Sequence, residues 1–321
     1  MGRLVFLVLF GMLYFSSGGF SAKLERLMDN VVVLRVPDIY GSRVTVPISC
    51  GEAFRDEPVT WKRDGVFQPA LQGNDIHVTV REWDGGDFSC HQSPEGPALN
   101  HTLLLVQLEP DNRTAILQPR GADRDYIHCS TPNYRGSFHC HWSKHHHRSG
   151  ASVLMVKSHR NQEPVPCVVE PSGSEMCCEE NNCPYKEEQH RISLTLYMKS
   201  ASRLEAYTKA FYLRDIVTPG PPTNLHIITR SETSRAFGWN YPESWDKPCS
   251  YFSLLFQVKV VRSGGTCHSE EYVLEDATSQ MVYVVNRAKK YVFCVRAQDK
   301  HTGGPWSEWS QCDVTRDRFI C

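Results

Sequence analysis

Short stretches in which apolar and polar residues alternate dominate the amino-acid sequence, and clusters of Gly, Pro, Asn and Asp separate them. Successive side chains of a strand point to opposite faces. In residues 291–297, this places Tyr291, Phe293, Val295 and Ala297 on one face and Cys294 and Arg296 on the other. After the N-terminal region, no long stretch shows a helical period. The pattern predicts an all-β protein.

A second alternating stretch begins at Tyr251, whose side chain the pattern turns outward. Its predicted core set consists of Phe252, Leu254, Phe256 and Val258. A chain of 321 residues is longer than one ordinary sandwich domain. The sequence therefore suits two or three tandem β-sandwich domains.

The first unit, about residues 23–107, contains Cys50, then Trp61, then Cys90. This order resembles an immunoglobulin domain, in which a disulfide joins two sheets and the indole packs on it. That family usually has Tyr where Phe88 stands, so the hydroxyl that ties the corner to the backbone is missing. We expect the ring still to fill the core, at a cost of about 1 kcal/mol for one lost hydrogen bond.

The second unit, about residues 108–217, contains the close pair Cys129 and Cys140, with Trp142 shortly after it. Such a pair resembles the first half of a cytokine-binding module. Histidines surround Cys140 and include the run 145–147, which raises the alternative of a metal site. Consecutive histidines on a strand point to opposite faces, and their spacing does not match a closed tetrahedral site. We expect no metal and no cofactor.

The third unit, about residues 218–321, follows a proline-rich stretch, 214–222, which we call the elbow. Prolines stiffen the chain, so this connection is short and firm rather than a flexible tether. The alternating stretches of the third unit resemble a fibronectin type III domain.

The third unit ends in a tryptophan box that is typical of cytokine-receptor modules. It consists of Trp306, Ser307, Glu308, Trp309 and Ser310. If this segment pairs beside residues 291–297, Arg296 can insert between the two indoles, a cation–π contact of roughly 0.5–2 kcal/mol. The alternative is that the two tryptophans only complete a core. Both interpretations give the box a structural role.

Several features favour secretion. Thirteen cysteines are natural in a secreted β protein and hard to explain in a reducing compartment. The apolar run 4–15 is too short to span a bilayer as a typical helix, so we expect a signal peptide over residues 1–22. Asn100 and Asn112 each begin an acceptor sequence for an N-glycan. We see no later apolar stretch for a membrane anchor, no lipid-anchor signal, and a net charge of -1 that gives no reason to expect nucleic acid.

The domain order, the proline elbow and the tryptophan box together resemble the interleukin-12 subunit beta family, whose secreted, receptor-like chain is shared by interleukin-12 and interleukin-23. The local runs 214–216, 250–254 and 295–299 are also similar to that family. The resemblance implies one half of a heterodimeric cytokine, which holds a four-helix alpha subunit and presents it to a cell-surface cytokine receptor. It implies no catalysis. It also implies that Tyr134, Tyr251 and Asp299 contact the alpha subunit at the elbow.

The resemblance also implies an interchain disulfide from Cys183 to the alpha subunit, and a loop closed by Cys167 with either Cys177 or Cys178. The alternative is that all bridges lie within domains. Sequence does not fix which of the two adjacent cysteines pairs, so both count among the expected bridges.

Within the family a bridge ties the strand that follows the tryptophan box back to its domain. We therefore expect Cys312 to pair, with Cys294 on the adjacent strand as its partner. With thirteen cysteines, at least one must stay unpaired or bond another chain, and Cys321 could link a homodimer.

Two other classes compete with a cytokine subunit. A soluble cytokine receptor or decoy of the interleukin-6 receptor kind has the same domain order but binds its cytokine without a covalent bond. An immunoglobulin-type adhesion or matrix protein explains the sandwiches but not the tryptophan box. An enzyme is disfavoured because the sequence has no Gly-x-Ser-x-Gly, His-Glu-x-x-His or phosphate-loop motif.

Overall fold

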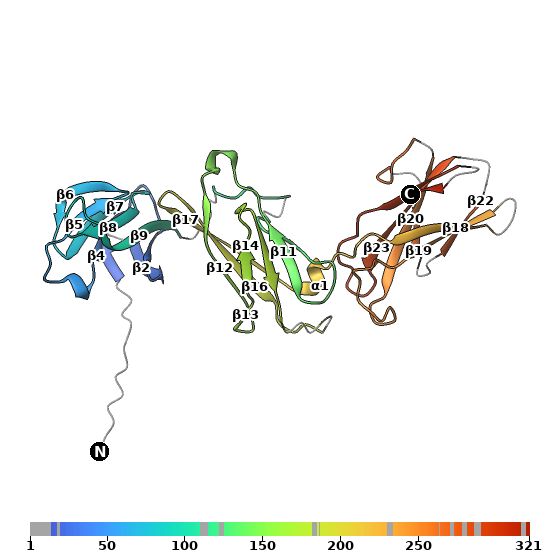
Figure 1. The fold of residues 1–321 in the computed structure, drawn as a ribbon, viewed down its shortest axis with the longest axis horizontal. Helices are drawn as coiled ribbons and strands as arrows, with labels where there is room; N and C mark the ends of the chain where they lie inside the picture. The colour runs from blue at the N-terminus through green and yellow to red at the C-terminus, as the bar shows by residue number, and fades with distance from the viewer. Residues whose placement is uncertain are drawn as a thin grey trace, which may run out of the picture. The chain divides into compact units, whose positions relative to one another are not determined.

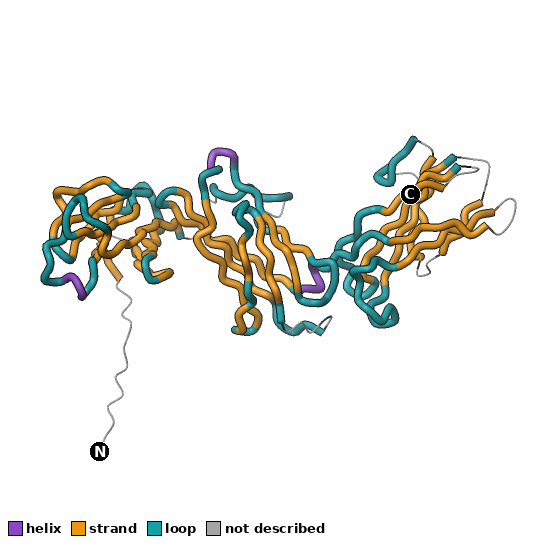
Figure 2. Tube along the Cα trace, in the orientation of Figure 1, coloured by secondary structure: helices purple, strands orange, loops and turns teal. Residues whose placement is uncertain are grey.

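The structure is a computed structural model and describes residues 14–17, 20–109, 115–121, 125–181, 185, 187–229, 234–262, 264–269, 273–277, 281–285, 290–315 and 319–321. These residues form an all-β chain, as the alternation predicts, and the tube in Figure 2 is strand or loop almost throughout. The described helical elements are short, namely α1 (Leu213–Ile216) and the 3-10 turns η1 (Glu52–Phe54) and η2 (His146–Arg148). No helix in this part of the chain is long and apolar enough to cross a membrane.

Contacts between residues divide the chain into two compact units, with the division inside the region predicted as the second domain. Unit 1 consists of Met1–Tyr126, Ser143–Val156 and Thr195–Tyr207, and unit 2 of Ile127–Trp142, Lys157–Leu194 and Thr208–Cys321. Three strands run from one unit into the other, namely β12 (Ser152–Arg160), β16 (Ile192–Ser200) and β17 (Arg203–Phe211). The domain limits predicted from the sequence therefore stay predictions.

Unit 1 contains the first β-sandwich, drawn in blue and cyan in Figure 1. One sheet contains β1 (Tyr14–Ser17), β2 (Phe20–Met28), β3 (Val31–Val36), β9 (Ala98–Leu108), β8 (Gly86–His91), β5 (Thr60–Arg63) and β6 (Val66–Gln72). In this sheet β3 runs parallel to β9, whereas β2 is antiparallel to β3 and β8 is antiparallel to β9. A separate antiparallel pair is formed by β4 (Arg43–Ser49) and β7 (Asp75–Arg81).

The core of this sandwich is apolar. A disulfide joins Cys50 to Cys90, and the indole of Trp61 is 1% exposed beside it in the same core cluster. The indole Nε1 donates a hydrogen bond of 2.9 Å to the carbonyl of Gly73, so its one polar atom is satisfied. The ring of Phe88 is also buried, at 1% exposure. Loss of the usual tyrosine hydroxyl therefore leaves the ring in the core.

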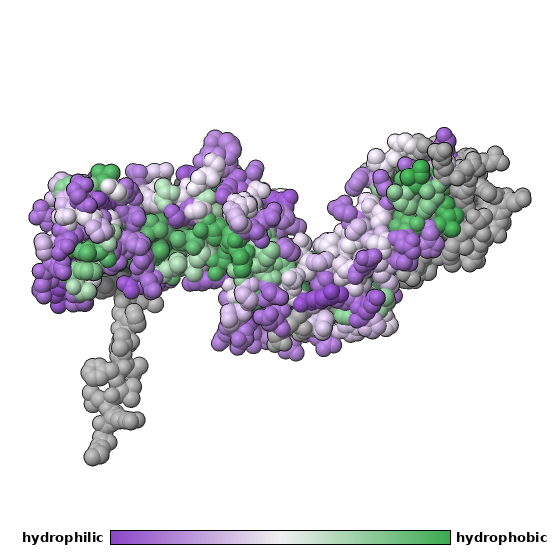
Figure 3. Space-filling model, in the orientation of Figure 1, coloured by the Kyte–Doolittle hydropathy of each residue, from purple (hydrophilic) through white to green (hydrophobic). Residues whose placement is uncertain are grey.

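Apolar side chains are also partly exposed in unit 1, where residues 153–156 of β12 are each half-buried. Leu154 of this run packs against a small core, as Tyr197 of β16 also does. In Figure 3, apolar residues gather over the middle of the chain, where Figure 1 draws β12 and β17. Half-exposed apolar surface of this kind is suited to contact with another protein.

Unit 2 begins with a four-stranded sheet whose order is β10 (His128–Ser130), β11 (Ser137–His141), β15 (Glu175–Glu179) and β14 (Cys167–Val169). Strand β13 (Glu163–Pro164) pairs with β12. Cys129 lies opposite Cys140 in register and Cys167 opposite Cys178, and both pairs form disulfides. Because side chains alternate, the neighbouring Cys177 points the other way and its thiol is free. The expectation of a bridge at Cys177 is therefore corrected.

The last sandwich lies in unit 2 and has two sheets (Figure 1). One is formed by β18 (Thr223–Thr229), β19 (Ser234–Asn240) and β22 (Met281–Val285). The other has the order β21 (Val273–Ala277), β20 (Leu254–Arg262), β23 (Tyr291–Asp299), β24 (Ser310–Val314) and β25 (Phe319–Ile320). Phe237 stacks on Phe293 between the sheets, with ring centroids 4.3 Å apart. The predicted core set is buried, namely Phe252, Leu254, Phe256 and Val258.

The disulfides of this sandwich differ from the prediction. Strands β23 and β24 are neighbours, but Cys312 lies opposite Phe293, so its side chain points to the face opposite that of Cys294. Cys294 bonds instead to Cys267, and Cys312 bonds to Cys321. The expected bridge from Cys294 to Cys312 is therefore wrong. Cys321 is occupied and is not available to link a homodimer.

Candidate partner-binding site at the proline elbow

The elbow, residues 214–222, is fixed to the loop 131–136 by backbone hydrogen bonds within unit 2. The amide of Thr131 donates to the carbonyl of Ile216 at 3.1 Å, and the amide of Thr218 donates to the carbonyl of Thr131 at 2.8 Å. The Thr131 side chain is itself buried. Because proline lacks an amide proton, the elbow depends on such contacts from outside its own segment.

Tyr134 lies in that loop and is fully buried. Its hydroxyl donates to Oδ2 of Asp299 at 2.7 Å, and its backbone amide donates to Oδ2 of Asp246 at 2.7 Å. The ring packs on Trp245 and Phe252, with centroids 6.1 and 5.7 Å away. Burial and then the hydrogen bond to Asp299 raise the pKa of Tyr134 well above its usual range. The phenol therefore stays protonated and keeps donating.

Asp246 fixes the same loop a second time. Its Oδ1 accepts a hydrogen bond of 3.0 Å from Nε of Arg135, whose side chain is 63% exposed. The side-chain amide of Asn133 donates to the carbonyl of Ser244 at 3.1 Å. Three consecutive residues therefore hold the middle of the loop, and the cation of Arg135 remains at the surface.

Burial corrects the expected roles at this site. Asp299, like Tyr134, has no exposed surface, so in the isolated chain neither side chain is available to touch a partner. Tyr251 differs, because it is 42% exposed and its ring lies edge-on to Phe252. Tyr185 is 48% exposed and packs on the same Phe252 ring. The site thus has a buried polar floor, formed by Tyr134 and Asp299, and an exposed aromatic rim, formed by Tyr251 and Tyr185.

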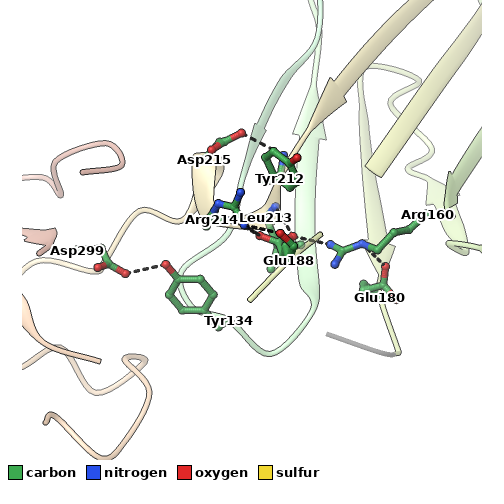
Figure 4. A network of polar contacts seen from close by, with 9 residues as sticks. All are labelled: Tyr134, Arg160, Glu180, Glu188, Tyr212, Leu213, Arg214, Asp215 and Asp299. Atoms are coloured by element: carbon green, nitrogen blue, oxygen red, sulfur yellow. Dashed lines mark hydrogen bonds and ion pairs between the residues drawn. The ribbon is translucent and has the colours of Figure 1, made fainter. Parts of the chain in front are cut away.

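A second polar network leads to the elbow, and Figure 4 shows it. The carboxylate of Glu188 has no exposed side-chain surface and accepts the backbone amides of Leu213 at 2.7 Å and Arg214 at 2.9 Å, at the start of α1. The guanidinium of Arg160 donates to Glu188 at 2.7 Å and lies 3.1 Å from Glu180. A short helix end is thereby capped by a carboxylate that is distant in sequence.

The tryptophan box also packs against β23 through half-buried side chains. The Arg296 guanidinium lies 4.8 Å from the ring centroid of Trp306 and 4.5 Å from that of Trp309, so it stacks with both indoles. The Ser307 amide donates to the carbonyl of Ala297 at 2.8 Å, and the amide of Ala297 donates to the Ser307 hydroxyl at 2.9 Å. The box therefore extends the sheet and holds Arg296 in place.

The chain is similar to known proteins over most of its length. A family model described as cytokine interleukin-12p40 C-terminus matches residues 124–200, and the fibronectin type III domain model matches residues 220–313. The interleukin-12 subunit beta of Papio anubis and that of Homo sapiens are each 30% identical over 85% of this chain and 87% of their own length. The chain belongs to the interleukin-12 subunit beta family. The protein of that name from Mesocricetus auratus is 28% identical over 88% of this chain. As a member of the family, the chain is a cytokine subunit with receptor-like domains.

Two predicted site residues of this family member, Cys183 and Asn112, lie outside the described residues. Asn100 is half-buried on β9, and its side-chain amide donates to the carbonyl of Cys50 at 2.9 Å. The amide has a second hydrogen, so this bond does not by itself use up the nitrogen that a glycan would modify. Among the described residues, no three side chains of His, Cys, Asp or Glu form a group that could hold a metal ion.

Sequence reasoning missed several residues of the elbow. Tyr185 had a usable signal, because it is a large aromatic residue in a polar segment. Arg160 and Glu188 had none, since they meet only after the chain folds. Asp246 follows a buried tryptophan but belongs to no recognisable motif. Motif comparison finds residues that share a spacing along one segment. It does not detect these contacts, because they join residues of separate segments.

Proposed function

We propose that this chain is the beta subunit of a heterodimeric cytokine, which binds a four-helix alpha subunit at the elbow and presents it to a cell-surface cytokine receptor. One observation carries the proposal: exposed Tyr251 and Tyr185 stand on the buried ring of Phe252, beside the polar floor. Tyrosine gives a large contact area with little loss of rotamer freedom, and such residues dominate binding energies. No catalytic step is needed.

Tyr134 and Asp299 support this surface from below. Their hydrogen bond and the contact of the Tyr134 ring with Phe252 hold the aromatic rim in one shape before the partner arrives. A preorganised surface binds more tightly because less ordering is required on binding. The exposed Arg135 would offer the partner a cation at the edge of this surface.

The remaining parts of the proposal rest on the sequence and on family membership. Cys183 would form the interchain disulfide, and Asn100 and Asn112 would carry glycans on a secreted chain. The domains would be a signal peptide over 1–22, an immunoglobulin-like domain over 23–107, and fibronectin type III domains over 108–217 and 218–321. A homodimer would be the alternative product when no alpha subunit is present.

The test is co-expression of the chain with a candidate four-helix alpha subunit, followed by non-reducing and reducing gels. We expect a reducible heterodimer that disappears with Cys183→Ser, while a noncovalent complex persists on native gels. In that background, Tyr251→Ala with Tyr185→Ala should weaken the noncovalent complex by about tenfold or more. A monomer in every lane would instead favour a soluble receptor or decoy.

A further inference from the structure

The outward face of the four-stranded sheet in unit 2 carries a thiol beside an imidazole. Cys177 of β15 lies opposite His139 of β11 in register, and Sγ of Cys177 lies 3.1 Å from Nδ1 of His139. Both side chains point away from the face that holds the disulfide of Cys178, because neighbouring residues of a strand alternate. Cys177 is half-buried and free, and His139 is exposed. We call these two residues the Cys177 pair.

The Cys177 pair has the chemistry of a zinc site. Thiolate sulfur and imidazole nitrogen are ligands that zinc prefers, and two such atoms lie about 3.5 Å apart around a tetrahedral ion. A small rotation of the side chains therefore allows one ion to touch both atoms. Oε1 of Glu170 lies 3.5 Å from the thiol sulfur, and the charges of Glu170 and Glu175 attract a cation to this place.

Disulfide exchange suits the same thiol less well. Burial raises the pKa of the Cys177 thiol, and the hydrogen bond to Glu170 and the charges of Glu170 and Glu175 raise it further. Less thiolate is then present at neutral pH, and the thiolate is the nucleophile in exchange. A metal ion, in contrast, displaces the thiol proton as it binds. The surroundings therefore favour a cation as the partner of this sulfur.

One chain provides only part of such a site. A structural zinc site has four protein ligands, and within the described ranges no three side chains of His, Cys, Asp or Glu form a group for a metal ion. The Cys177 pair thus fills two of four positions. Because the pair lies on the outside of a sheet, a twofold axis through the ion brings the same two atoms from a second copy. The complete set is then two sulfurs and two nitrogens, a common structural zinc site.

The face around the pair is self-complementary in its polar groups. Histidines occupy the side formed by β10 and β11, where His128 lies opposite His141 with ring centroids 5.0 Å apart. Carboxylates occupy the side formed by β15, where Glu175 and Glu179 are exposed. A twofold axis between these sides places the histidines of one copy against the carboxylates of the other. It also covers Val168 of β14, an apolar side chain that is 70% exposed beside the pair.

We propose that Cys177 and His139 form one half of a zinc site, which a second copy of this chain completes. As the ion binds, each thiol gives its proton to solvent, and each imidazole binds in its neutral form through Nδ1. Two protons leave for each ion, and nothing is oxidised or reduced. The resulting dimer is noncovalent and requires no alpha subunit, so this inference does not rest on the proposed function.

The experiment uses the full-length chain with Cys183→Ser and Cys249→Ser, so that Cys177 is the one cysteine left outside the described disulfides. Light scattering after size exclusion gives the molar mass with added Zn²⁺ and with EDTA. We expect a dimer with one zinc ion for two chains, which returns to monomer in EDTA. Non-reducing gels run in parallel should show a monomer. With Co²⁺ in place of Zn²⁺, we expect the visible absorption of a tetrahedral ion and a thiolate-to-cobalt charge-transfer band.

Two variants remove one ligand each, namely Cys177→Ser and His139→Gln. Loss of a group that only orients a ligand costs about 10- to 100-fold in metal affinity, so each variant should bind zinc at least about tenfold more weakly and stay a monomer. The matched control is His159→Gln, which removes an exposed histidine of β12. It should stay within about twofold of the parent chain in zinc affinity.

Three results would overturn the proposal. A dimer that survives EDTA would show that something other than a metal ion joins the copies. One zinc ion on a chain that stays monomeric would show that no second copy completes the site. Zinc binding that persists in Cys177→Ser, with no thiolate band for cobalt, would assign the metal to other side chains, such as the histidine run 145–147. None of these results bears on the complex with an alpha subunit.

Discussion

The core around Trp61 and the elbow around Tyr134 both enclose a fully buried aromatic ring, but different forces hold them. Trp61 lies between sheets beside a disulfide, and one backbone carbonyl satisfies its only polar atom. Tyr134 lies in a loop, and two aspartates, Asp246 and Asp299, receive its amide and its hydroxyl. Apolar packing tolerates small shifts, whereas a buried hydrogen bond requires a particular distance and direction. The apolar core around Trp61 is therefore suited to be a stable framework, and the elbow around Tyr134 is suited to be a defined binding surface.

The largest effect should come from the apolar core. Trp61→Ala removes a fully buried indole and leaves a cavity, and such changes cost about 3–5 kcal/mol. We expect the free energy of unfolding, measured by urea denaturation with circular dichroism, to fall by that amount. A loss below about 1 kcal/mol would mean that the first sandwich does not unfold with the transition being observed, or that it repacks.

Removal of a single oxygen atom at the elbow should lower the stability of the chain. Tyr134→Phe keeps the ring and removes the hydroxyl, which leaves the buried Oδ2 of Asp299 without that donor. We expect a loss of about 1–3 kcal/mol in the free energy of unfolding. The matched control is Tyr251→Phe, whose ring is 42% exposed and which should stay within about 0.5 kcal/mol of wild type. Equal effects of the two changes would contradict the buried role of the Tyr134 hydroxyl.

The two regions also differ in how far the sequence predicts them. Alternation predicts which residues of β20 enter the core, and the order of Cys50, Trp61 and Cys90 predicts the first sandwich, because both patterns are local. The bridge from Cys294 to Cys312 was predicted wrongly because the register of the two strands decides whether these cysteines share a face. Register is a property of two paired strands, so the alternation within one strand does not give it. The buried state of Tyr134 has the same cause, because loops from separate segments cover it.

The protonation of Tyr134 provides a second measurement that distinguishes the elbow from the apolar core around Trp61. Its folded-state pKa is raised by burial, so the folded chain keeps a proton that the unfolded chain releases above about pH 10. The stabilisation is fully present below that pH and is lost as pH rises, by no more than about 1.4 kcal/mol per pH unit for this one group. Between pH 10 and 11 we expect the free energy of unfolding to fall more steeply for wild type than for Tyr134→Phe. Parallel pH profiles would contradict the shift.

The smallest effect should come from the tryptophan box, where both ring stacking and polar contacts hold the Arg296 cation. Burial lowers the pKa of Arg296, and the nearby carboxylate of Glu308 opposes this, so the guanidinium stays charged at neutral pH. Arg296→Lys keeps the charge but loses the planar stack and the hydrogen bond of 2.7 Å from Nε to Gln257. We expect a loss of about 0.5–1 kcal/mol in the free energy of unfolding.

The control for the box is Arg296→Met, which keeps the apolar stem and removes the charge. If cation–π attraction holds the indoles, methionine should be less stable than lysine, and the near-ultraviolet circular dichroism of the tryptophans should weaken in the same order. If methionine is as stable as arginine, stacking area alone holds the box. The tryptophan box would then belong with the apolar core of Trp61 rather than with the polar elbow of Tyr134.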